Sequence, residues 1–441
     1  MPELRREFGL RDISLLAIAC IIGTRWMASA AHAGPGSILL WLLAALFLVI
    51  PVAIAVASLT EKHPQAGGIY VWTRGDFGPW HGFLAFWAYW VGLAFWFPSA
   101  AVFYTSVAAS ALGPSYEHLA GSRTYLVLAS LAAIWIALGT NIVGVRIGKW
   151  TENLGASASW VLGTLLVTVA WLVWKKRGMA TPYHLLPDSN WASLSFFSTI
   201  AYAMTGFESL GLVGSEIRNP KRDLKRAAWI ASVFTTLFYA GTTFALLVVK
   251  RPENISEVNG LAQVATTAGQ VIGAGWLPPA IALLVMATAI GSFGGLGSSV
   301  ARMPFAAGVD HLMPAAFAKI HPRWATPYIS IVIFGLLASV LLVLSQIGDT
   351  MREAYQTLVA LMVIAGFLPY IYMFGSSWKV GNRVSSLAGW GITALALASS
   401  VVPTADVQSV WLFELKLAAG TLAVIASGWL VYQTAQARIL K

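Results

Sequence analysis

Residues 18–31 read Ile18-Ala19-Cys20-Ile21-Ile22-Gly23-Thr24-Arg25-Trp26-Met27-Ala28-Ser29-Ala30-Ala31, an apolar run that a glycine and a cation interrupt. A charge at the middle of a bilayer costs from about 3 to above 10 kcal/mol unless it faces a cavity or finds a partner. Gly23 supplies the backbone freedom to break a helix, and broken helices at membrane depth survive only where protein buries them or where they line a cavity. The stretch therefore predicts an interrupted membrane span with Arg25 at a candidate site.

The composition is that of a polytopic membrane protein. Of the 441 residues, 58% are hydrophobic and 10% are charged, and apolar runs of about 18 residues or more recur from end to end with short joins. The net charge of +10 does not indicate nucleic acid, because the basic residues lie in the joins, where anionic lipid headgroups are the expected partners. Cys20 is the only cysteine, so an internal disulfide and a thiol metal site are excluded.

Hydropathy predicts twelve spans with both termini cytoplasmic, in the inner (plasma) membrane. With the N-terminus inside, nineteen Lys and Arg residues lie on the inner side and seven on the outer side. The predicted spans are 13–33, 37–59, 81–112, 125–145, 154–174, 193–213, 228–249, 277–300, 327–344, 355–374, 386–402 and 410–432.

Three joins are longer than the rest. Pro64 and the pair Gly67-Gly68 predict an irregular cytoplasmic segment over 61–72. The amphipathic join 302–326 suits a helix along the inner surface, and 250–262 reads as an outer polar loop.

A second interrupted span, Ile200-Ala201-Tyr202-Ala203-Met204-Thr205-Gly206-Phe207-Glu208-Ser209, repeats the features of the first. Gly lies beside Thr, with an aromatic and an ionisable residue in an apolar run. The two are the first and sixth spans, a separation expected of five-helix units repeated in opposite orientation. Corresponding broken helices in two halves are a pointer to the binding site of a transporter.

Several motifs in this order resemble the amino acid-polyamine-organocation superfamily over most of the chain. The residues that carry the resemblance are Gly23-Thr24-Arg25; Pro64 with Gly67-Gly68-Ile69-Tyr70-Val71-Trp72; Tyr202 to Glu208 with Glu216, Asn219, Pro220, Lys221 and Arg222; Gly291-Ser292-Phe293-Gly294-Gly295 with Arg302, Asp310 and Pro314; and Leu368-Pro369-Tyr370. The long Trp-rich third span and the polar first break look closest to the bacterial glutamate/GABA antiporter group.

The resemblance implies an all-α integral membrane fold. It would be LeuT-like, with a five-plus-five inverted repeat, broken first and sixth helices, and two peripheral helices. The chain would form a single domain over 1–441, with its core at about 13–374 and the peripheral helices at about 386–432. It would work by alternating access as an amino acid exchanger or a proton-coupled permease. Two departures stand out: Arg25 replaces the second Gly of the usual break, and Leu296 stands where the arginine/agmatine antiporters place a substrate-contacting Trp, which disfavours a guanidinium substrate.

The breaks predict the chemistry of the site. An unwound helix presents free N–H groups and the positive end of a half-helix, which suit a carboxylate, while freed carbonyls suit an ammonium group. We expect 22–26 to hold the α-carboxylate of a substrate and 203–206 to accept from its α-ammonium. The alternative for the two glycines is close helix packing. The predicted substrate-binding residues are Ile22, Gly23, Thr24, Arg25, Trp26, Trp96, Tyr202, Ala203, Thr205, Gly206, Phe207 and Leu296; for the aromatic ones, core packing is the alternative.

Two charged features remain to be interpreted: Glu208 with Arg25, and a group of charges on the inner side. Desolvation penalises the charged form of a buried carboxyl, so Glu208 is expected to be neutral or paired; it either carries a coupling proton or forms an ion pair with Arg25. In the first case Arg25 remains available to bind a substrate carboxylate, and the site favours acidic or neutral amino acids. The inner charges Glu216, Arg218, Lys221 and Arg222 are predicted to form gate salt bridges.

Other functions fit less well. Asymmetric broken helices argue against a channel, and the chain has no nucleophile elbow, phosphate loop, His cluster or metal spacing of an enzyme. We therefore predict no cofactor, no metal and no nucleic-acid partner; the expected partners are an amino acid, a coupling proton and membrane lipids. A permease for polyamines or cationic amino acids and a non-transporting amino acid sensor remain the alternatives.

Overall fold

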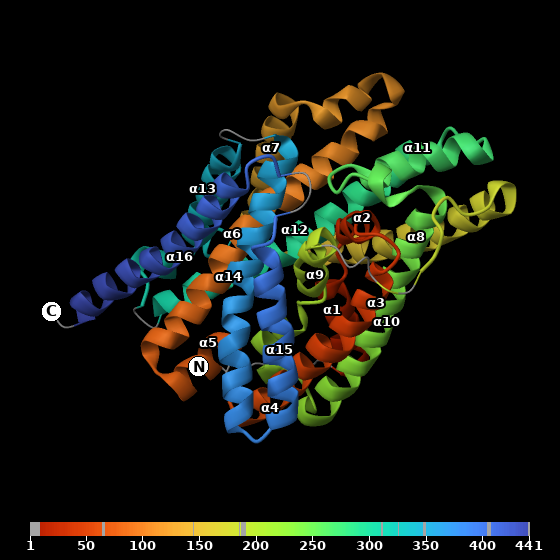
Figure 1. Cartoon of the computed structure of the whole chain (residues 1–441). Coiled ribbons are helices and arrows are strands. Elements are labelled where there is room, and N and C mark those ends of the chain that lie inside the picture. Colours follow the sequence, from red (N-terminus) through yellow and green to blue (C-terminus); the bar gives the residue numbers. More distant parts are fainter. Residues whose placement is uncertain are drawn as a thin grey trace.

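The computed structural model describes residues 9–63, 67–143, 145–184, 186, 191–309, 312–324, 326–346, 350–403 and 407–439. Every regular element in these ranges is a helix (Figure 1). In chain order the α-helices are α1 (Leu10–Ile21), α2 (Trp26–His32), α3 (Ser37–Ala44), α4 (Ile50–Lys62), α5 (Ile69–Phe77), α6 (Pro79–Ala108), α7 (Arg123–Val143), α8 (Val145–Arg177), α9 (Trp191–Ala203), α10 (Pro220–Val249), α11 (Gly260–Ile272), α12 (Leu277–Val309), α13 (Tyr328–Ser345), α14 (Met351–Lys379), α15 (Arg383–Ser400) and α16 (Val410–Ile439). The π-helix η1 (Ala45–Val49) and the 3-10 helices η2 (Ala109–Leu112), η3 (Pro114–Gly121), η4 (Phe207–Glu216), η5 (Pro252–Asn254) and η6 (Ala315–Ala318) complete the set.

Nine helical segments of the described ranges are long and apolar enough to cross a membrane. They are Ser37–Lys62, Pro79–Leu112, Arg123–Val143, Leu154–Arg177, Arg222–Val249, Leu277–Gly297, Tyr328–Ser345, Glu353–Lys379 and Val410–Ala437. Two further predicted spans are the interrupted ones, whose halves are each too short to cross alone. The twelfth, α15, carries Arg383 and four serines in its 18 residues, so the count of twelve stays a prediction.

Helix α6 is the centre of the molecule. It packs against α14, α12, α13 and α16, and 94% of its most apolar stretch is buried inside the protein. Its Trp and Phe side chains stack on one another and on neighbouring helices, as in the contact of Trp90 with Phe334 at 5.7 Å between ring centroids. Aromatic residues bury more area than other side chains, which suits a helix with no lipid-facing side. The helices that carry the two interruptions pack against each other, α1 against η4 and α2 against α9 (Figure 1).

The joins differ from their predicted form. Pro64 lies outside the described residues, but after Gly68 the chain forms the helix α5 rather than an irregular segment, because one positive-φ glycine pair is enough to separate it from α4. In the described part of 302–326, the four-residue 3-10 helix η6 (Ala315–Ala318) follows α12, and no longer amphipathic helix forms there. Instead α12 itself continues to Val309 through Pro304. The predicted polar loop 250–262 leads into a further helix, α11, that sequence reasoning missed.

Candidate functional site

The first break lies where the sequence predicts it. Helix α1 ends at Ile21, Ile22 has an extended backbone, and α2 begins at Trp26. Gly23 is required here, because a Cβ at this position would lie 2.7 Å from the indole nitrogen of Trp26. The Thr24 hydroxyl lies 3.1 Å from that of Thr288 on α12, which ties the break to the opposite side of the site.

The second break lies directly against the first. Helix α9 ends at Ala203, where the Thr205 hydroxyl donates to the Tyr202 carbonyl at 2.7 Å. Gly206 has φ +126°, and a Cβ there would lie 2.7 Å from the Cys20 carbonyl oxygen. Only glycine fits both the conformation and the approach. The two interruptions therefore share one place in the fold.

A tyrosine that the sequence analysis did not identify joins the two breaks. The Tyr239 hydroxyl on α10 accepts from the Gly23 amide at 2.7 Å and lies 2.8 Å from the Ile21 carbonyl and 3.4 Å from that of Ala203, to which it can donate. The Gly23 amide is therefore already paired. Within the described residues, the amides of Thr24 and Arg25 make no hydrogen bond, and they remain the free donors of this break.

Arg25 is 1% exposed and is held by neutral groups. Its Nη1 donates to the Ser99 hydroxyl at 2.6 Å, its Nη2 points at the Met362 sulfur at 3.1 Å, and its Nε has no partner. The guanidinium carbon lies 3.8 Å from the centre of the Trp26 ring and 5.2 Å from that of Trp96. Aromatic faces stabilise a desolvated cation by about 2 kcal/mol, which is less than its desolvation costs.

Glu208 is 4% exposed and is also held by neutral groups. One carboxyl oxygen accepts from the Gly206 amide at 2.8 Å and so caps η4, and the other accepts from the Tyr89 hydroxyl at 3.0 Å. The buried Tyr370 hydroxyl faces the same carboxyl and lies close enough to interact with it. Among the described residues, no ion pair joins Glu208 to Arg25, so the site contains two separate buried ionisable residues.

The remaining predicted residues divide between the site and the core. Tyr202 meets Trp26 edge to face at 6.1 Å between centroids and is half-buried, so it lies beside Arg25's aromatic shell. Ala203 and Phe207 are fully buried at the ends of the second break. Leu296 is a half-buried residue of α12 that packs against the core.

The described residues cover only part of the predicted inner gate. Arg222 pairs with its neighbour Asp223 at 2.8 Å. Arg218 is exposed, and the side chains of Glu216 and Lys221 lie outside the described part. Gate salt bridges among these four residues stay a prediction.

Ser99, Met362, Tyr89 and Tyr239 are the site residues that sequence reasoning missed. Serine, methionine and tyrosine are common in apolar spans, and only Ser99, directly after Pro98 in α6, carries any local signal. Their importance depends on which helices meet, which no single span reveals.

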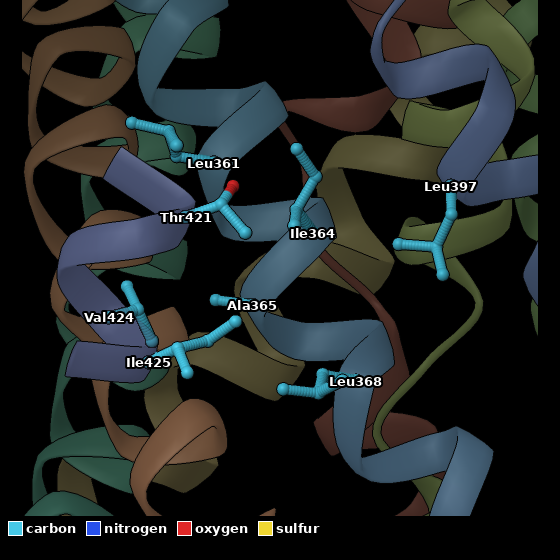
Figure 2. Close-up of a pocket in the computed structure, with 8 residues that line it drawn as sticks. All are labelled: Leu361, Ile364, Ala365, Leu368, Leu397, Thr421, Val424 and Ile425. Carbon is cyan, nitrogen blue, oxygen red and sulfur yellow. The ribbon is translucent and has the colours of Figure 1, made fainter. Parts of the chain in front are cut away.

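An apolar pocket lies away from the breaks, between α14, α15 and α16. Figure 2 shows its lining, with Leu361, Ile364, Ala365 and Leu368 on α14 facing Thr421, Val424 and Ile425 on α16, and Leu397 on α15. Its walls carry no charge, so it does not suit a zwitterionic ligand, and it leaves the breaks as the candidate site.

Comparison with known proteins identifies a family and a fold. The profile of the family described as amino acid permease matches residues 8–433. An uncharacterized transporter of Legionella pneumophila is 26% identical, over 98% of this chain and 97% of its own length. A protein of Lactococcus lactis named as a probable agmatine/putrescine antiporter is 23% identical over 86% and 81%. The crystal structure of MhsT in complex with L-phenylalanine has the same fold with a TM-score of 0.59, over 95% of this chain and 99% of that one, at 14% identity.

Proposed function

The chain belongs to the amino acid permease family, and from that premise we propose that it is a secondary active transporter for acidic or neutral amino acids. It works by alternating access, as an exchanger or a proton-coupled permease. We place it in the cytoplasmic membrane with twelve spans, a five-plus-five inverted repeat and both termini inside. In intact cells, an impermeant thiol reagent should then leave a cysteine at position 438 unlabelled in a Cys20→Ser background.

The proposed preference for acidic or neutral amino acids rests on one observation. Arg25 is a buried cation without a counter-charge among the described residues. A buried unpaired charge is expensive, and a substrate carboxylate would remove that cost through charge-assisted hydrogen bonds. The free Nε of Arg25 and the free amides of Thr24 and Arg25 supply donors at the same place. These groups favour an anion over a second cation, which Arg25 would repel in a low dielectric.

The substrate's ammonium group has acceptors at the second break. The carbonyls of Met204 and Thr205 accept no hydrogen bond from the described residues, whereas those of Tyr202 and Gly206 are taken by Thr205 and Ser209. Because the breaks are in contact, an amino acid can span them, with its carboxylate at Arg25 and its ammonium at these carbonyls.

Glu208 is the proposed proton carrier. As a carboxylate it accepts from Gly206 and Tyr89. A protonated carboxyl gains a donor, and the Tyr370 hydroxyl oxygen beside it can then accept. The surroundings of Glu208 therefore satisfy both of its protonation states, which supports proton coupling.

The alternative functions are a polyamine or cationic amino acid permease and a non-transporting sensor. Similarity to the Lactococcus lactis protein favours the first, and the unpaired Arg25 opposes it. The resemblance to the glutamate/GABA antiporter group fits an acidic substrate instead.

Counterflow in proteoliposomes tests the proposal. Vesicles loaded with glutamate, leucine, arginine or putrescine receive the labelled form of the same compound. We expect accumulation with glutamate or leucine and none with arginine or putrescine. Accumulation of the cations alone would reverse the substrate class, and no accumulation with any of the four would contradict transport.

A further inference from the structure

A second buried polar cluster lies about one turn of α2 away from Arg25. It forms where α2, α14 and the segment that precedes α11 meet. Its members are Ser29, Glu257, Tyr355 and Gln356, here called the Glu257 cluster. Ser29 follows Arg25 by four residues, one turn along the same face of α2. The far end of α2 is fixed to the segment by a 2.6 Å contact between His32 Nδ1 and the Ile255 carbonyl. The cluster therefore lies between Arg25 and the membrane face on which residues 250–262 lie, here called the loop face.

Glu257 is a buried carboxyl with little compensation. It is 4% exposed, and its one hydrogen bond in the described structure comes from Gln356 Nε2 at 2.9 Å. No Lys or Arg of the described chain forms an ion pair with it. A buried carboxylate with one neutral donor is under-satisfied, since its two oxygens can accept several hydrogen bonds.

The polar groups beside Glu257 also have few hydrogen-bond partners. Gln356 Oε1 is buried and has no hydrogen-bond partner in the described structure, and the buried hydroxyls of Tyr355 and Ser29 have at most each other as partners. Tyr355 lies beside Ser29 and within electrostatic range of both Arg25 and Glu257, which joins the cluster to the candidate site. Each buried unsatisfied polar group costs about 1–3 kcal/mol. Together with the under-satisfied Glu257, these oxygens form a buried set of acceptors suited to a ligand that donates hydrogen bonds.

We propose that the Glu257 cluster binds the ammonium group of an amino acid on its way between the loop face and Arg25; this inference rests on the proposed transport function. An ammonium group carries three donors and no acceptor. Glu257, Gln356 Oε1 and the hydroxyl oxygens of Tyr355 and Ser29 provide the matching acceptors. Arg25 attracts the carboxylate and repels the ammonium, so a zwitterion would enter carboxylate first, with its ammonium held one helical turn behind.

The test compares the two faces of the membrane. Glu257→Gln keeps the shape of the side chain and removes its charge, and Glu253→Gln changes an exposed carboxyl of the same segment as a matched control. Labelled glutamate or leucine, whichever has the lower KM, is supplied to intact cells, which present the loop face under the proposed topology, and to everted vesicles, which present the opposite face. Glutarate or 4-methylpentanoate, the corresponding des-amino acids, serve as competitive inhibitors.

We expect Glu257→Gln to raise KM about tenfold at the loop face, as for a lost hydrogen bond to a charged group, and to leave KM at the opposite face and inhibition by the des-amino acid unchanged. Gln356→Leu should act in the same way, and it replaces Glu257→Gln if that variant fails to reach the membrane. An equal rise at both faces, a parallel loss of inhibition by the des-amino acid, or the same effect from Glu253→Gln would overturn the proposal.

A KM that depends on Na⁺ in the wild type and not in the variant would also overturn it, because the oxygens would then bind a metal cation. If the wild type transports neither amino acid, the proposed function itself fails; if it transports and KM is unchanged in Glu257→Gln, only this inference fails.

Discussion

The two breaks each hold one buried ionisable residue, and the surroundings of these residues differ in kind. Arg25 lies among two indole rings, one hydroxyl and one thioether, with its Nε unpaired. Glu208 has a donor on each of its two oxygens, from the Gly206 amide and the Tyr89 hydroxyl. The cation is short of partners, and the carboxyl is well supplied.

This difference assigns the two charges different tasks. A group whose hydrogen bonds are complete gains little from a ligand, whereas an incomplete one gains the whole charge-assisted contact. Arg25 therefore suits substrate recognition, and Glu208 suits a change of protonation within a fixed frame. If the two residues formed an ion pair, their charges would cancel, and the site would have no net charge.

The largest expected effect is that of Arg25→Ala. Losing a charge-assisted contact of about 2 kcal/mol should raise KM for an acidic or neutral amino acid by roughly one to two orders of magnitude. Uptake kinetics in proteoliposomes measure this. Arg25→Met, which keeps most of the side-chain volume, should raise KM as much and controls for the cavity.

The ion-pair alternative gives the opposite result in a double variant. If Arg25 neutralised Glu208, then Arg25→Ala combined with Glu208→Gln would restore the wild-type KM, because neither charge would be stranded. The separation of the two groups predicts no rescue. Recovery of wild-type affinity in the double variant would mean that Arg25 is a structural partner of Glu208 and does not read the substrate.

The next effect is on pH dependence. Gln mimics a protonated carboxyl in shape and hydrogen bonding, so Glu208→Gln should flatten the pH profile of uptake while substrate binding stays measurable. Glu414→Gln, at an exposed position of α16, is the matched control. A profile that keeps its wild-type shape in Glu208→Gln would remove this residue from proton coupling.

Local sequence predicted the two breaks because their causes are local. Gly23 and Gly206 interrupt apolar runs, and each is required where it stands by a contact or a positive φ. What surrounds the charges could not be predicted, because Ser99 and Met362 come from α6 and α14, and no local signal in either helix connects them with Arg25. The same holds for Glu257, whose burial depends on α11 and on how its preceding segment packs on α2. A few adjacent residues determine where a helix is interrupted, whereas the partners of a buried charge depend on the packing of the whole bundle.

The smallest expected effect tests whether the backbone of the first break or the side chain of Arg25 binds the substrate carboxylate. The Tyr239 hydroxyl holds the Gly23 amide and the Ile21 carbonyl, so Tyr239→Phe leaves both unpaired and should lower the free energy of unfolding by about 1–3 kcal/mol. If the Arg25 side chain is the main carboxylate ligand, KM should change by less than about threefold, because freeing one more amide adds little beside a guanidinium. Thermal unfolding and uptake kinetics on the same preparation measure the two quantities. Tyr104→Phe, another buried tyrosine near Arg25, is the control for loss of a hydroxyl. A KM change in Tyr239→Phe as large as that in Arg25→Ala would indicate that the backbone of the break, positioned by Tyr239, holds the carboxylate, and the contrast between the two buried charges would then concern stability rather than recognition.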